Sequence, residues 1–256
     1  MIDLVKIECY KIIKRKDFYI MMSMIFIPIL YAVGLAMNIG SITYVGKEKI
    51  SGLSFATEMY VFVYMCFIYF VILSVCVIRS LKGEIENKSI QLYVQRIQDR
   101  KRLYLAKNMA YTILVIGNAL LFLCISIVCF YLFLTSRSDI AVLELFRRGE
   151  LSYCFIKMLG IVLSFLFTLN FSMFLSTYRR SFEAMGIFVF VWLASMYLKE
   201  FYMIQYFVPI YHLEKILNSD IGNLQWNNFI MMLFLVCLYS LVSIMLGCKK
   251  FEKSDI

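Results

Sequence analysis

The sequence predicts an all-α, polytopic membrane protein with six transmembrane helices in a single domain over residues 1–256. Three observations support this fold class. The chain is 62% hydrophobic and contains only two prolines. Its apolar runs approach or exceed the length of about 20 residues that crosses the hydrocarbon core of a bilayer. Charged residues gather between these runs, as they do in the loops of a membrane protein. Because the runs themselves are so apolar, water cannot be the main solvent of the chain.

The apolar runs and their charged boundaries place the six spans. They are expected at about residues 18–37, 59–78, 110–135, 153–176, 183–198 and 229–247, of which the fifth is short. No cleavable signal peptide is expected, because residues 1–17 are too polar for its apolar core and no small-residue cleavage site follows the first long apolar run.

Residues 1–17 are predicted to form an amphipathic helix in the membrane–water interface. Its apolar face is formed by Ile2, Val5, Cys9, Ile12 and Ile13. The opposite face carries Asp3, Lys11, Lys14 and Arg15. Such a helix places its basic side chains near anionic lipid head groups. A solvated, positively charged segment that only fixes the topology is the alternative.

The distribution of lysine and arginine predicts the orientation of the chain. Six spans put both termini on one side, which holds 18 of these bases, whereas the other side holds 7 and Lys157 lies at the edge of the fourth span. Basic residues gather in cytoplasmic loops. Both termini are therefore expected in the cytoplasm, as in a multi-pass protein of the cell (plasma) membrane. The net charge of +9 is interpreted as topology, and no nucleic-acid partner is expected.

Several classes of chemistry lack the residues they need. The eight cysteines lie within or at the ends of apolar runs without a CxxC pair, and are interpreted as small hydrophobic residues. His212 is the only histidine, and neither HExxH nor GxSxG occurs. The chain also lacks GxxxxGK[ST], the loop that cradles ATP phosphates. We expect no catalytic residues, no metal site and no cofactor in this chain.

The longest charged stretch falls in the loop predicted between the second and third spans, residues 80–108. A short amphipathic helix is expected at about 88–98, with an apolar face formed by Ile90, Tyr93, Val94 and Ile97. Charged side chains accompany it at Glu84, Glu86, Arg96 and Arg100. The residues alone leave two interpretations open: a docking helix for a soluble partner, or a helix that covers lipid head groups.

Two motifs in this loop are Glu84-Ile85-Glu86-Asn87-Lys88-Ser89-Ile90 and Arg100-Lys101-Arg102-Leu103, which Lys107 follows. They resemble the first cytoplasmic loop of the type-2 class of ABC exporter permeases. In that family, an acidic start and a Lys/Gly-Thr/Ser-aliphatic motif precede a short helix, then Ser-Arg and a lysine that opens the third span. Ile97-Gln98-Asp99-Arg100 stands where the family usually has Pro-Ile-Ser-Arg, and Asp99 can still end the helix and cap.

This resemblance implies the role of the loop and the partners of the chain. The residues expected to couple to an ATPase are Glu84, Glu86, Ile90, Tyr93, Val94, Arg96, Ile97 and Arg100. Two copies of a separate ABC ATPase would hold ATP and magnesium. A second permease chain, identical or a paralogue, would complete the pathway within the membrane lipid. The resemblance also implies an N-terminal interfacial helix and an outer re-entrant hairpin between spans five and six.

Residues 199–227 are predicted to form that hairpin. Nine apolar residues lie nearly in a row from Phe201 to Tyr211, which is too apolar for a loop in water. The segment should dip into the outer leaflet as two short helical pieces bent near Pro209, with His212 unliganded just below the interfacial charges. Phe207, Pro209 and Ile210 would form an outer gate. A surface-lying amphipathic helix without a gating role is the alternative.

The expected function is therefore that of the permease subunit of an ATP-driven exporter. By resemblance to small peptide-export, bacteriocin-export or immunity permeases, the expected cargo is amphipathic or antimicrobial peptides, or other hydrophobic compounds. A stand-alone channel or secondary carrier is the alternative, because such proteins need only a few polar residues within their spans. Candidates for those polar residues are Asn118, Lys157, Thr168 and Asn170, with Glu58 and Glu183 near span starts.

Overall fold

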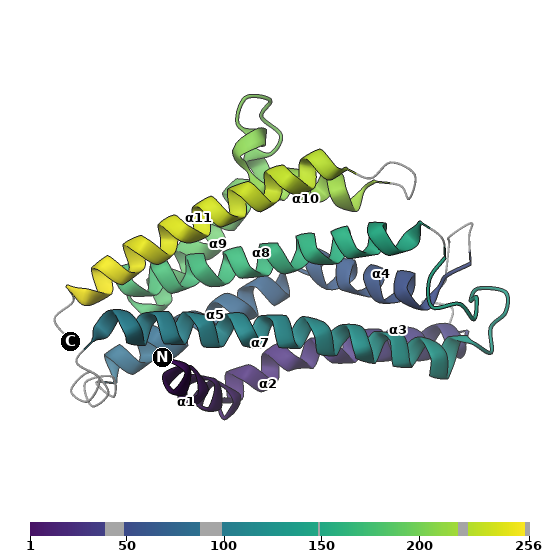
Figure 1. The fold of residues 1–256 in the computed structure, drawn as a ribbon, viewed down its shortest axis with the longest axis horizontal. Helices are drawn as coiled ribbons and strands as arrows, with labels where there is room; N and C mark the ends of the chain where they lie inside the picture. Colours follow the sequence, from purple (N-terminus) through teal and green to yellow (C-terminus); the bar gives the residue numbers. More distant parts are fainter. Residues whose placement is uncertain (39–48, 88–98, 148, 220–224, 254–256) are drawn as a thin grey trace.

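The computed structural model describes residues 1–38, 49–87, 99–147, 149–219 and 225–253. This part of the chain is helical and contains no β-strand beyond an isolated bridge between Ile50 and Ala141. The long helices run side by side along one axis, and both termini lie at the same end of the bundle (Figure 1).

Five helical segments are long and apolar enough to cross a membrane. They are α2–η1–α3 (Lys16–Met22, Ser23–Ile25 and Phe26–Ala36), α7 with η2 (Arg100–Cys129 and Phe130–Leu134), α8 (Glu150–Tyr178), α9 (Ser181–Leu198) and α11 (Trp226–Glu252). A sixth span exists if α4 (Gly52–Met65) and α5 (Ile68–Glu86) are counted as one broken helix. The predicted multi-pass helical architecture is confirmed.

The predicted second span, 59–78, differs most from the structure. Instead of one straight helix, α4 and α5 meet at a bend of 69°. The backbone of Cys66 is extended (φ −73°, ψ 93°), so α4 ends there although no proline or glycine is adjacent.

Aromatic packing accompanies this bend. The ring of Tyr64 packs edge-on against Phe70, with centroids 5.6 Å apart. Phe67 and Phe70 both contact Trp192 of α9, at centroid distances of 5.9 and 3.9 Å. The bend thus allows rings on both of its sides to pack together and against a third helix.

The loop predicted at 80–108 is shorter in the structure, because helices continue into it from both sides. α5 extends to Glu86 and α7 begins at Arg100. Asp99 caps α7 by accepting a hydrogen bond from the backbone N–H of Arg102 at 3.2 Å. The predicted helix itself, at about 88–98, lies outside the described residues.

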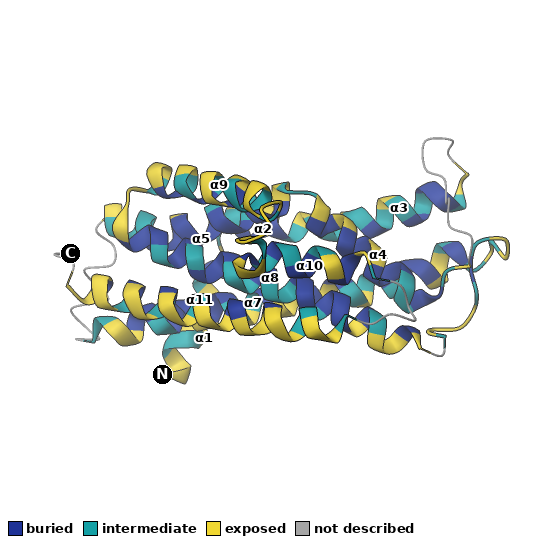
Figure 2. Ribbon diagram, turned by 90° about the horizontal axis from the view of Figure 1, so that it is seen from above, coloured by how far each residue is buried: buried dark blue, intermediate teal, exposed yellow. Residues whose placement is uncertain are grey.

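The N-terminal helix α1 (Ile2–Ile13) packs mainly on α7, and its N-terminal end stands out from the side of the bundle (Figure 2). The predicted apolar face only partly matches its inner face. Ile12 is buried, but Ile2 and Ile13 are 72% and 40% exposed. The inner face of α1 instead includes an acidic residue, Glu8, which is only 2% exposed.

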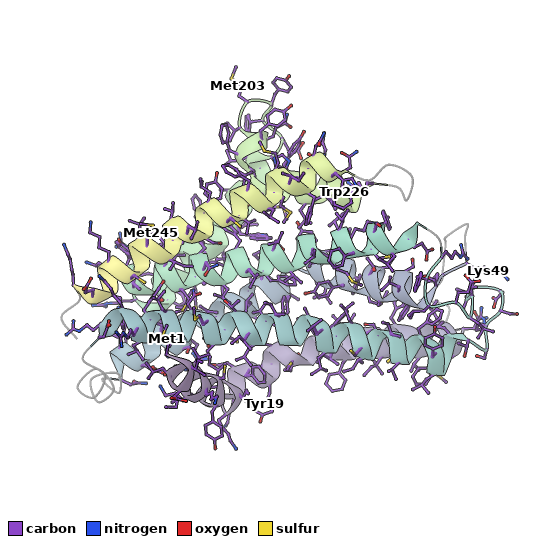
Figure 3. All side chains as sticks on the ribbon, viewed as in Figure 1. Met1, Tyr19, Lys49, Met203, Trp226 and Met245 are labelled. Atoms are coloured by element: carbon purple, nitrogen blue, oxygen red, sulfur yellow. The ribbon has the colours of Figure 1, made fainter. Side chains whose placement is uncertain are left out.

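The predicted outer hairpin contains η3 (Gln205–Phe207) and α10 (Pro209–Leu217). Pro209 is the first residue of α10. Backbone N–H groups in the first turn of a helix have no partner within the helix, so the N–H that proline lacks is not needed there. α10 buries its apolar face against α8 and α11. The segment 199–207 instead projects from the side of the bundle, with Met203 near its tip and 85% exposed (Figures 1 and 3).

α8 occupies the centre, because it packs against α4, α5, α7, α9, α10 and α11. The close approach of α11 to α7 requires a glycine. A Cβ atom at Gly247 would overlap the hydroxyl group of Tyr104, whose side chain is fully buried on α7.

We predict that Gly247→Ala lowers stability by about 1–3 kcal/mol, because the confined ring of Tyr104 must move. Gly117→Ala is the matched control: a Cβ there has no neighbour within 4 Å, so stability should be unchanged or higher. Thermal unfolding of the detergent-solubilised chain measures both. Equal midpoints for the two variants would contradict the required close approach.

Candidate functional site

A buried lysine joins three helices at the end of the bundle that holds both termini. Lys107 on α7 is fully buried. Its Nζ donates hydrogen bonds to Glu84 Oε2 on α5 at 2.8 Å and to the carbonyl oxygen of Ser80 at 3.3 Å. Glu8 Oε2 on α1 lies 3.1 Å from the same Nζ. The two groups form an ion pair without a hydrogen bond.

A second lysine completes this ionic cluster, which we define as Glu8, Lys11, Glu84 and Lys107. Lys11 Nζ lies 2.6 Å from Glu8 Oε1 and 3.8 Å from Glu84 Oε1. Two acids and two bases therefore compensate one another. Burial by itself raises the pKa of Glu8, but the charges of Lys107 and Lys11 and the hydrogen bond from Lys11 outweigh it and lower the pKa below its ordinary value.

Glu86, at the last turn of α5, binds the start of α9. Its carboxylate accepts hydrogen bonds from the backbone N–H and the hydroxyl group of Ser181, at 3.3 and 3.0 Å. A carboxylate at this position also interacts favourably with the positive end of the helix dipole.

Arg100 opens α7 and contacts the end of α11. Its Nη1 donates to the carbonyl oxygen of Glu252 at 3.4 Å. The neighbouring Lys101 forms an ion pair with the Glu252 carboxylate at 3.1 Å. The two ends of the predicted coupling segment are therefore tied to α1, α9 and α11.

Three of the eight predicted coupling residues are described, and all three form contacts within the chain: Glu84, Glu86 and Arg100. The other five, Ile90, Tyr93, Val94, Arg96 and Ile97, lie outside the described residues. Contact with an ATPase stays a prediction for the whole set.

Sequence reasoning missed Glu8 and the burial of Lys107. The sequence pattern marks Lys107 only as the lysine that opens the third span. Glu8 lies one turn before Ile12 on the inner face of α1, so an acid within a predicted apolar face was a signal for a buried basic partner.

The predicted gate residues line an aromatic cavity among α8, α9, α10 and α11. The cavity has a volume of about 160 Å³, and its walls include Phe171, Phe188 and Trp192. Phe207 and Ile210 both line it, but Phe207 is 66% exposed whereas Ile210 is 6% exposed.

Charged and polar contacts hold the predicted hairpin at both of its ends. Lys199, after α9, binds the Glu214 carboxylate on α10 at 2.5 and 2.7 Å. His212 is buried, with Nδ1 3.0 Å from Asn228 Oδ1 on α11 and Nε2 3.0 Å from the carbonyl oxygen of Tyr206. The histidine thus joins the projecting segment to α10 and α11.

Polar residues within the spans also find partners. Lys157 on α8 is buried, and its Nζ lies 3.6 Å from Glu58 Oε1 on α4. Asn108 donates to Asn170 at 2.8 Å, across α7 and α8. Within the described ranges, no group of three or more histidine, cysteine or acidic side chains is arranged to hold a metal ion.

No protein-family model matches the sequence, and a search of curated proteins finds no significant match.

We predict that Lys107→Met destabilises the chain by about 3–5 kcal/mol, because Glu8 and Glu84 lose a buried counter-ion. Lys101→Met, which removes an exposed ion pair, should cost less than about 1 kcal/mol. Denaturant unfolding in detergent compares the two. Equal losses would show that the buried cluster has no special role.

Stability should also depend on pH through Glu8. Because the pKa of Glu8 is lowered in the folded chain, its stabilisation is fully present above the ordinary pKa of 4.5 and is lost as pH falls through the lower folded-state pKa. Glu8→Gln removes this titration. The decline of the thermal midpoint at acidic pH should therefore be shallower in Glu8→Gln than in wild type, and parallel declines would contradict the assignment.

Proposed function

We propose that the chain is the membrane subunit of an ATP-driven exporter of the ABC class, with ATP hydrolysed by a separate subunit. The observation that carries this proposal is the anchoring of the segment between Asn87 and Asp99. Glu84 and Glu86 on one side of it, and Arg100 on the other, contact α1, α7, α9 and α11. A force applied to this segment would reach most of the bundle.

The contacts suggest how coupling would work. The apolar face of the predicted helix at 88–98 would dock on the ATPase, and closure of two ATPase copies would move it. The ionic cluster would then carry the motion to α1, while Glu86 and Arg100 would carry it to α9 and α11. In this mechanism the three described charges transmit force rather than only contacting the partner.

The cargo would be an amphipathic peptide or another hydrophobic compound, and a second permease chain would complete the pathway. The aromatic cavity that Phe207 and Ile210 line supports contact with an apolar side chain of such a cargo, because its volume of about 160 Å³ is that of a small group and its walls are aromatic. The segment 199–217 would act as the outer gate, held by the contacts of Lys199 and His212.

A secondary carrier is the second candidate, and the bend between α4 and α5 favours it. Discontinuous spans often form substrate sites in carriers. A cavity of about 380 Å³ lies at this bend, with Tyr64, Trp192 and Glu214 on its walls. Reconstitution separates the candidates: substrate uptake into vesicles that contain this chain alone, driven by an ion gradient, would favour the carrier.

Replacement of Ile90, Val94 and Ile97 by serine should uncouple ATP hydrolysis from transport. We expect transport to fall by about tenfold or more while insertion stays intact, because the docking face is lost. The measurement is transport and ATPase activity of the reconstituted complex with its ATPase. The matched control replaces Leu143, Leu145 and Phe146, which are exposed between η2 and α8, and should leave coupling unchanged. Normal transport and co-purification of the first variant would refute the docking role.

Cysteine labelling tests the gate in a background without the native cysteines. Ile210→Cys, at a side chain that is 6% exposed, should be protected from a membrane-impermeant reagent at rest and become labelled during ATP turnover. Asp139→Cys is the control, because its side chain is 60% exposed beyond the end of η2 and should label in both states. Free labelling of position 210 at rest would refute a closed gate.

A further inference from the structure

An open apolar groove runs between α1 and α7. Ile2, Tyr10 and Ile13 form the α1 wall, while Met109 and Ile113 form the α7 wall. The groove has a volume of about 740 Å³. Ile113 is 55% exposed and Ile116, one turn further along α7, is 40% exposed, so the groove continues into the outward surface of a spanning helix. In a membrane, that surface faces lipid chains.

Two of the polar side chains on the walls of the groove already have hydrogen-bond partners. The hydroxyl group of Thr112 donates to the carbonyl oxygen of Asn108 at 3.0 Å. The thiol of Cys9 donates to the carbonyl oxygen of Ala110 at 3.9 Å. Lys6 is exposed, and no carboxylate of the described residues lies within ion-pair distance of its ammonium group. The occupant that suits such a groove has an apolar chain and an anionic head group.

A second base strengthens the charge at the rim. Lys6, Tyr10 and Lys14 follow one another at intervals of four residues, which places them on one face of α1. Lys14 Nζ lies 5.5 Å from the centroid of the Tyr10 ring and, like Lys6, has no carboxylate partner among the described side chains. Lys11 differs, because the ionic cluster neutralises it.

We propose that this groove binds one phospholipid with an anionic head group. An acyl chain lies between α1 and α7, and the phosphate contacts Lys6 and Lys14. The ionic cluster supports the site, since it holds the opposite face of α1 against α5 and α7 and leaves this face free. This inference does not depend on the proposed transport function.

Native mass spectrometry of the purified full-length chain tests the proposal, with phosphatidylglycerol and phosphatidylcholine added as probes. Wild type should retain phosphatidylglycerol preferentially. Lys6→Gln/Lys14→Gln should reduce that retention by about tenfold, because each basic side chain near an anionic surface contributes to the attraction. Thermal unfolding confirms that the variant is folded, since both side chains are exposed.

Two further variants separate charge from shape. Lys249→Gln/Lys250→Gln removes the same charge from the last turn of α11, where Lys250 lies 5.7 Å from the Tyr178 ring centroid, and should leave lipid retention unchanged. Ile113→Trp fills the groove and should reduce retention of both lipids. Equal retention of the two lipids by wild type, unchanged retention in Lys6→Gln/Lys14→Gln, or a second protein chain bound in place of lipid would each overturn the proposal.

Discussion

The buried ammonium group of Lys107 is the constraint on which the terminal end of the bundle depends. A charge without water is costly unless counter-ions and hydrogen bonds surround it. Here the compensation comes from Glu8 on α1, Glu84 on α5 and the backbone of Ser80. The positions of α1, α5 and α7 are therefore set by one group, since displacing any of them would expose or isolate a buried charge. The same cluster holds α1 in the orientation that forms the groove against α7.

The other half of the bundle is organised mainly by aromatic side chains, although the ion pairs of Lys157 and Lys199 also lie there. Trp192 on α9 packs against Phe70 and Phe67 beside the bend of α4 and α5, and against Phe188 on its own helix. Apolar contacts of this kind tolerate rearrangement better than a buried ion pair, because they do not require one fixed geometry. Buried charges thus join the helices at one end of the bundle, whereas aromatic packing shapes the cavity among α8, α9, α10 and α11.

The coarse architecture could be predicted from the sequence because apolar length is a local property. Five of the six predicted spans fall on continuous helical segments, the second falls across the bent pair α4 and α5, and Asp99 caps as its residue type suggests. The bend at Cys66 could not be predicted, since the apolar run continues through it and the rings that pack beside it come from α4, α5 and the distant α9. Neither could the ionic cluster, because Glu8 and Lys107 are 99 positions apart and meet only after α1 docks. α7 begins ten residues before the predicted third span, because its polar first turns are helical ahead of the apolar run.

Hydrogen exchange of the backbone amides of α1 in the Glu84→Gln variant tests the central role of this cluster most directly. The substitution lies on α5 and keeps the shape of the side chain, so it changes α1 only through the shared lysines. The account predicts faster exchange throughout α1 in the variant, with α8 and α11 as protected as in wild type. Unchanged protection of α1 would show that its position does not depend on the ionic cluster and would contradict the account.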